Sequence, residues 1–221
     1  MIDACPWDSF DPATISFCEA RLCATIAEPA NAFTSLSKTL VGLWLIPRAR
    51  RAHPALWTIV IAALLQGPLG FALHATGTFW GEALDVSGMF LISSTLLAFA
   101  LARRFAWPAA RLVTAWLGLV LASVGLLLVV RQSGIPNFSL QLMAWLALEL
   151  SAPAASRRWL YSALAVFAVG FGCWLADKTR VLCDADNHVI NGHALWHVAT
   201  SLCLALFFEH AAASLQRSRP S

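Results

Sequence analysis

Three histidines and one aspartate have the residue types and the spacing of a metal site. His193 and His197 are four positions apart in GHALWH, so on a helix their imidazoles share one face about one turn apart. His74 and Asp85 begin and end the string HATGTFWGEALD. Neutral imidazoles are good zinc ligands, and three of them leave a fourth position for water. The set therefore predicts a catalytic zinc site in which Asp85 orients this water and takes its proton.

The composition indicates which elements must position these residues. Of the 221 residues, 59% are hydrophobic and 12% are charged, about half the ~25% of a soluble domain. This length fits seven spans of roughly 20 residues and a modest N-terminal segment, but no second folded domain. We therefore expect a single all-α integral membrane domain over residues 1–221. The net charge of +3 is spread beside the apolar runs, which argues against nucleic acid as a partner, and no obligate protein partner is evident.

The apolar runs predict a seven-transmembrane helix bundle. They cover approximately residues 32–47, 55–78, 83–102, 109–130, 138–155, 159–176 and 192–213. The first and fifth runs are short, so hydropathy alone gives six to seven spans. Residues 1–30 carry five acids and no unbroken apolar run. We expect them to remain in the mature protein as an extramembrane segment that packs on the outer face.

Arginine clusters follow every odd-numbered span. They are Arg48, Arg50 and Arg51; Arg103 and Arg104; Arg157 and Arg158; and Arg217 and Arg219. Because basic residues accumulate in cytoplasmic loops, this pattern predicts the N-terminus outside and the C-terminus inside.

The same alternation places the three histidines and Asp85 at one depth, at the outer helix ends. Each histidine could instead be an isolated interfacial residue. Ionisable groups within spans are costly and usually functional, however, so the set favours a metal.

Longer motifs resemble a known family. The strings FCEA (residues 17–20), IAEPANAFTSLS (26–37), HATGTFWGEALD (74–85) and CDADNHVINGHALWH (183–197) occur in the order found in alkaline ceramidases, especially their bacterial branch. That family lies within a superfamily of seven-helix membrane hydrolases that includes the adiponectin receptors. The resemblance implies hydrolysis of the amide bond of a membrane lipid, ceramide, to a sphingoid base and a free fatty acid. It also implies that His74, His193 and His197 hold Zn²⁺ and that Asp85 supports the water at the metal.

One position departs from this resemblance beside the first zinc ligand. The family often has a serine one helical turn before that histidine, where this chain has Gly70. Thr76, Ser87 or backbone donors could take its place, or the activity could be reduced.

The N-terminal acids leave a second question open. Eukaryotic members resemble one another in a calcium site, and the corresponding acids here are Glu19 and Glu28. Ca²⁺ prefers six to eight oxygen ligands, and Arg21 between these acids could instead neutralise one of them in a salt-bridged cap. The resemblance further implies a disulfide between Cys18 and Cys183, unless both thiols stay unpaired.

The sequence is compatible with a second function and with a second membrane. A non-catalytic seven-helix receptor or scaffold that contains zinc is the alternative to a hydrolase. A bacterial inner membrane with a periplasm-facing site is the preferred location, and the endoplasmic reticulum or Golgi membrane is the alternative. Glu149 in the fifth run either contacts substrate or, two turns from Arg157, is a snorkelling or paired carboxylate.

Overall fold

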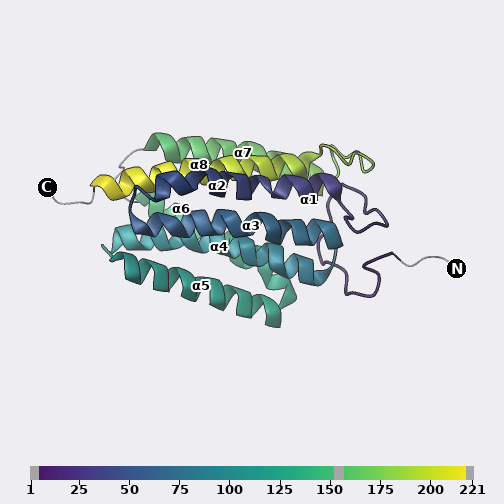
Figure 1. Ribbon diagram of the computed structural model, residues 1–221, viewed down its shortest axis with the longest axis horizontal. Coiled ribbons are helices and arrows are strands. Elements are labelled where there is room, and N and C mark those ends of the chain that lie inside the picture. The colour runs from purple at the N-terminus through teal and green to yellow at the C-terminus, as the bar shows by residue number, and fades with distance from the viewer. Residues whose placement is uncertain (1–4, 152–156, 218–221) are drawn as a thin grey trace.

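The computed structural model describes residues 5–151 and 157–217, in which the regular elements are helices. In chain order they are α1 (Pro29–Ser35), α2 (Ser37–Ala49), the 3₁₀ helix η1 (Pro54–Leu56), α3 (Trp57–Thr76), α4 (Phe79–Arg104), α5 (Ala109–Val129), the 3₁₀ helix η2 (Arg131–Ser133), α6 (Gly134–Ser151), α7 (Arg157–Lys178) and α8 (Gly192–Arg217). The long helices run side by side in one bundle, with α1 and α2 end to end along one line (Figure 1).

Within the described residues, five helical segments are long and apolar enough to cross a membrane. They are Pro54–Thr76, Phe79–Arg104, Ala109–Val129, Arg157–Lys178 and Gly192–Leu215. They coincide with the second, third, fourth, sixth and seventh expected spans, and the chain is an all-α membrane protein. The fifth expected span corresponds to α6, which carries Asn137, Gln141 and Glu149 and is not among the five. Seven spans and their orientation therefore stay a prediction.

The first expected span, residues 32–47, is divided into α1 and α2 at Leu36. The amide of Leu36 donates to the carbonyl of Phe33, three residues back, which is the tighter hydrogen bond of a 3₁₀ turn. The hydroxyl of Ser35 donates to the carbonyl of Ala32 in its own helix and to that of Gly67 in α3. The break therefore occurs where α1 is fastened to its neighbour.

The helix surfaces carry large apolar side chains that are exposed in the isolated chain. Leu121 on α5 is 70% exposed, and Val169 on α7 is also 70% exposed. Soluble proteins rarely expose such extended apolar surface, whereas a bilayer covers it. The buried core lies mainly among α2, α3, α4 and α8, around Leu45, Ile59 and Phe208. The inner helices therefore provide the packed frame for polar residues.

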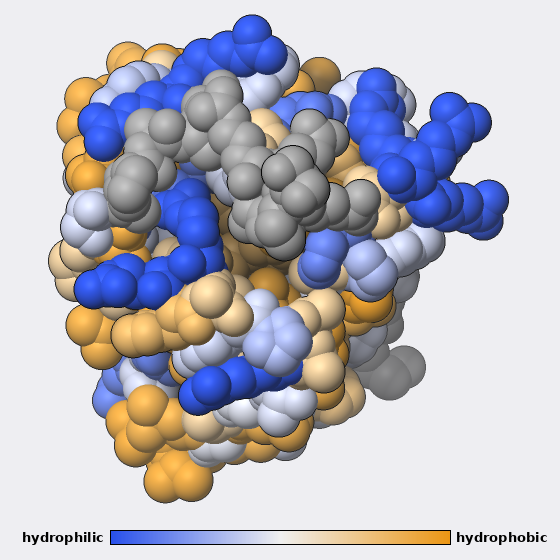
Figure 2. All heavy atoms as spheres, turned by 90° about the vertical axis from the view of Figure 1, so that its left-hand side faces the viewer, coloured by the Kyte–Doolittle hydropathy of each residue, from blue (hydrophilic) through white to orange (hydrophobic). Residues whose placement is uncertain are grey.

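One end of the bundle carries the basic clusters at the ends of α2 and α4 and at the start of α7, whereas Arg219 lies outside the described residues. Hydrophilic side chains gather at this end, and the flanks beside it are largely apolar (Figure 2). Here Glu149 pairs with Arg103 at 2.7 Å and with His210 at 2.6 Å, which joins α6 to α4 and α8. Glu149 is therefore a paired carboxylate, as one alternative expected, but its partners are Arg103 and His210 and not Arg157.

Candidate metal centre

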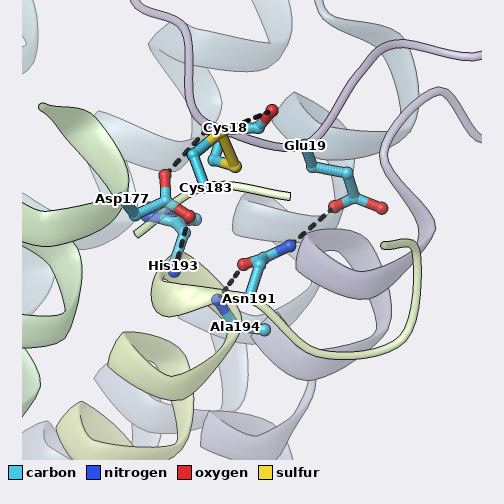
Figure 3. The surroundings of a disulfide bond; sticks show 7 residues. All are labelled: Cys18, Glu19, Asp177, Cys183, Asn191, His193 and Ala194. Carbon is cyan, nitrogen blue, oxygen red and sulfur yellow. Dashed lines mark hydrogen bonds between the residues drawn. A yellow bond between two sulfur atoms is a disulfide. The ribbon is translucent and has the colours of Figure 1, made fainter. Parts of the chain in front are cut away.

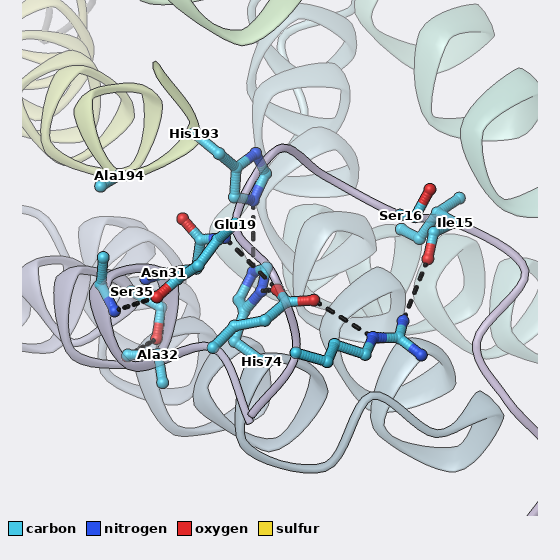
Figure 4. A network of polar contacts seen from close by, with 12 residues as sticks. Ile15, Ser16, Glu19, Asn31, Ala32, Ser35, His74, His193 and Ala194 are labelled. Atoms are coloured by element: carbon cyan, nitrogen blue, oxygen red, sulfur yellow. Dashed lines mark hydrogen bonds and ion pairs between the residues drawn. The ribbon is translucent and has the colours of Figure 1, made fainter. Parts of the chain in front are cut away.

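The three histidines meet at the opposite end of the bundle. His74 lies in the last turn of α3, and His193 and His197 lie in the first two turns of α8; all three are buried. One ligand nitrogen from each lies within 4.8 Å of the others. The Nε2 atoms of His74 and His193 are 3.2 Å apart, and Figure 4 shows the two rings facing each other.

Local signals in the sequence place these histidines at helix ends. Helix α3 stops at Gly77, whose φ of 62° lies in the left-handed region that glycine favours. Helix α8 starts after Asn191, whose Oδ1 accepts a hydrogen bond from the amide of Ala194 at 2.8 Å.

Asp177 at the end of α7 fixes the same turn of α8. Its two oxygens accept from the amides of His193 at 3.1 Å and Cys18 at 2.8 Å (Figure 3).

Hydrogen bonds at Nδ1 fix the orientation of two of the three imidazoles. Nδ1 of His74 lies 2.7 Å from Oε2 of Glu28. Burial by itself raises the pKa of Glu28, but the hydrogen bonds from His74 and Asn31 and the charge of Arg21 hold this pKa below its usual range. An ionised carboxylate only accepts hydrogen bonds, so Nδ1 of His74 carries the proton and Nε2 presents its lone pair.

His197 reaches the same state through a hydroxyl. Its Nδ1 lies 3.1 Å from Oγ1 of Thr34, and this hydroxyl donates its own proton to the carbonyl of Ala30 at 2.6 Å. The hydroxyl oxygen therefore accepts from Nδ1 of His197, which leaves Nε2 as a free lone pair. Two of the three rings are thus prepared to bind a cation.

The arrangement fits a metal with a preference for nitrogen ligands. With Zn–N bonds of about 2.0–2.1 Å, two ligands of a tetrahedral site are about 3.4 Å apart, close to the observed Nε2 separation. Nδ1 of His193 is buried and has no hydrogen-bond partner in the described part of the chain. Phe17 stacks on this ring at 3.7 Å between centroids, so the N-terminal segment covers the centre.

Asp85 lies beside this cluster and not within it. Its Oδ1 accepts a hydrogen bond from Nε2 of Gln66 at 2.9 Å, and the charge of Lys38 acts on this carboxylate. No direct hydrogen bond to the three histidines is found within residues 5–151 and 157–217. Gln66 and Lys38 were missed in the sequence, although polar residues inside apolar runs are a recognisable signal.

The space beside Gly70 is occupied by a serine from another helix. A Cβ atom at Gly70 would lie 3.2 Å from Cβ of Ser35 and 3.0 Å from Oδ1 of Asp85. The hydroxyls of Thr76 and Ser87 instead donate to carbonyls of their own helices. Ser35 is therefore the hydroxyl residue next to Gly70.

The two N-terminal acids are held by donors from the protein. Glu19 accepts from the amides of Ala30 and Asn31 at 2.9 and 3.0 Å, and further from His188 and Asn191. The carboxylate of Glu28 lies 3.3 Å from Nε of Arg21. This pairing has the geometry of the salt-bridged cap, and calcium binding at Glu19 and Glu28 stays a prediction.

Two disulfides close this end of the molecule. Cys18 is bonded to Cys183, and Cys5 is bonded to Cys23, a pair that sequence reasoning missed. The first joins the N-terminal segment to the loop before α8, next to Asp177 (Figure 3).

Comparison with protein families accounts for nearly the whole chain. The model of the Ceramidase family matches residues 11–219, which include all three histidines and Asp85. A search of curated proteins found no match. The family match and the membrane helices lead to one conclusion: the chain belongs to the Ceramidase family and is a membrane hydrolase of lipid amides.

Proposed function

We propose that the protein is a zinc-dependent hydrolase that cleaves the amide bond of ceramide, or of a similar lipid amide, to a sphingoid base and a free fatty acid. The observation that carries this proposal is the set of three buried imidazoles, two of which present Nε2 because Glu28 and Thr34 hold their Nδ1 protons. His74, His193 and His197 would hold the zinc. When bound, zinc polarises the amide carbonyl and makes water nucleophilic at neutral pH.

Asp85 is the proton carrier in this proposal. Gln66 holds one oxygen of its carboxylate, so the other takes a proton from the attacking water and passes it to the amide nitrogen. The hydroxyl of the water ends on the acyl carbon, and the nitrogen leaves as an amine. Phe17 and the segment around it limit the access of bulk water to this end.

We also propose that this end faces an oxidising compartment, with residues 1–30 outside the membrane. The basic clusters at the opposite end and the two disulfides here support this orientation. A bacterial inner membrane with the site facing the periplasm remains our preference over the endoplasmic reticulum or Golgi membrane.

The proposal is tested with purified protein in detergent. Ceramides of several chain lengths are supplied, released fatty acid is measured, and bound zinc is determined on the same samples. We expect His193→Ala to lose zinc and turnover, and Asp85→Asn to keep zinc while losing turnover by about 10²–10⁴-fold. Exposed Asp184→Asn is the matched control and should resemble the wild type.

Two results would contradict the proposal in different ways. Retained zinc with no turnover of any lipid amide would favour a receptor or scaffold. Turnover that survives the loss of His193 would remove the histidine cluster from the reaction.

A further inference from the structure

Lys38 of α2 is a buried cation that the reaction described above does not use. Lys38 is only 5% exposed, and it lies within the first expected span. Lysine inside a membrane bundle is costly and is generally retained for a function.

The neighbours of Lys38 show which way it faces. The hydroxyl of Ser37 lies 2.6 Å from that of Ser201, so Ser37 faces α8. The hydroxyl of Thr39 donates to the carbonyl of Leu64 at 3.1 Å, so Thr39 faces α3. Successive helical residues differ by about 100°, which places Lys38 between these directions, toward the interface of α3 and α8.

The metal centre lies at this interface, because His74 belongs to α3 and both other histidines belong to α8. The charge of Lys38 interacts with Asp85 on α4 and with His193 and His197 on α8. Thr34, which touches His197, precedes Lys38 by four residues, a separation that a lysine side chain can span. Within the described residues, the ammonium has no hydrogen bond or ion pair at contact distance. The centre therefore contains a buried cation without a directly bonded anion.

We propose that Lys38 is a substrate-binding residue of this centre and that its ammonium binds the acyl oxygen of the lipid. The proposal rests on the hydrolase function described above. Before hydrolysis the ligand is the amide carbonyl, and afterwards it is the carboxylate of the fatty acid. A buried ammonium binds a full negative charge best, so the product carboxylate is the preferred ligand.

This arrangement also orients the substrate. The sphingoid base is a cation once it is released, and two like charges repel strongly in a medium of low polarity. The amine must therefore leave on the side away from Lys38, whereas the acyl group remains on the side of α2.

The test compares palmitate with hexadecanol, which has the same chain length but no charge. Binding to the full-length protein in detergent is measured with and without zinc, because zinc also attracts carboxylates. We expect the wild type to bind palmitate at least tenfold more tightly than hexadecanol in both states. Lys38→Met should abolish this preference in the zinc-free state, and Lys38→Arg should restore most of it.

The other lysine supplies the matched control. The charge of Lys178 also acts on His193, but its Nζ lies on the outer side of Phe17 and donates to the carbonyl of Ser16 at the surface. Lys178→Met therefore tests whether any nearby ammonium is enough, and it should keep the palmitate preference. Zinc content and thermal melting show whether each variant is folded.

Binding without turnover separates this inference from the proposed function. If the zinc-free wild type binds palmitate and hexadecanol equally, the proposed role of Lys38 is overturned, whether or not Lys38→Met folds. A palmitate preference that persists in folded Lys38→Met would also overturn it. If ceramide is not cleaved but palmitate binding still depends on Lys38, the hydrolase function fails while the binding site stands.

Discussion

The three histidines differ in the hydrogen-bond partners of their Nδ1 atoms. His74 donates to a carboxylate, His197 donates to a hydroxyl, and Nδ1 of His193 has no hydrogen-bond partner in the described part of the chain. A carboxylate partner raises the basicity of a metal-binding imidazole and fixes its orientation. Glu28 is therefore expected to contribute more to metal affinity than Thr34 does.

Replacing this carboxylate should weaken zinc binding. We expect Glu28→Gln to lower the affinity by about 10–100-fold, because the amide cannot stabilise a protonated Nδ1 as a carboxylate does. Competition with a chromophoric chelator measures the change. Glu82→Gln is the matched control, because Glu82 is also buried at this end but binds Thr14. An equal loss in both variants would show a general effect of buried acids.

Restoring a serine at position 70 should not improve the enzyme. In Gly70→Ser the new Cβ meets Ser35 and Asp85 at 3.2 and 3.0 Å, so the neighbours must move. We expect a loss of stability of about 1–3 kcal/mol, typical of overpacking, without a gain in turnover. Thermal melting and fatty acid release measure the two effects, and adding Ser35→Gly should recover stability. A gain in turnover from Gly70→Ser alone would show that the site lacks a hydroxyl.

At the scale of elements, the start of α8 matters most for the metal centre. Asp177 of α7 binds the amide of His193 and that of Cys18, and the side chain of Asn191 caps the same helix. This turn is therefore fixed by the residue just before the helix and by an α7 carboxylate that also binds the N-terminal segment.

Asp177→Asn should loosen this turn. Asparagine offers one carbonyl oxygen to two backbone donors, so one amide is left without an acceptor at a cost of about 1–3 kcal/mol. We expect a lower melting temperature together with weaker zinc binding. If melting falls while zinc affinity is unchanged, Asp177 supports the fold but not the position of His193.

The sequence allows some elements to be predicted better than others. Long apolar runs indicate α3, α4, α5, α7 and α8, because lipid contact requires such runs. The break at Leu36 cannot be predicted in this way, since it depends on the contact of Ser35 with Gly67 on another helix. The histidine spacing indicates a metal site, but Thr34 as the partner of His197, 163 residues away, depends on how the helices pack.

For the molecule as a whole, the two disulfides differ in what they connect. Cys5–Cys23 closes a loop within the N-terminal segment, whereas Cys18–Cys183 spans 165 residues and lies beside Asp177. Loop-closure entropy for that length gives an upper bound of about 5 kcal/mol. The stabilisation is smaller here, because membrane-inserted helices already restrict the unfolded chain.

Removing the long-range disulfide should therefore have the larger effect. We expect Cys18→Ser with Cys183→Ser to lower both the melting temperature and zinc retention, and Cys5→Ser with Cys23→Ser to change them less. Treating the wild type with a reductant should lower the melting temperature and zinc retention as the loss of Cys18–Cys183 does. Equal effects of the two pairs would contradict a link between the Cys18–Cys183 bond and the metal centre.

The proposed metal ligands come from distant parts of the chain, and this has a consequence for biogenesis. His74 and His193 are 119 residues apart, and α8 emerges from the ribosome after the other described helices. A nascent chain that lacks α8 therefore has one of the three proposed ligands. If the three histidines hold zinc, loading must follow the insertion of α8, and a truncated or misinserted chain would remain an inactive apoprotein.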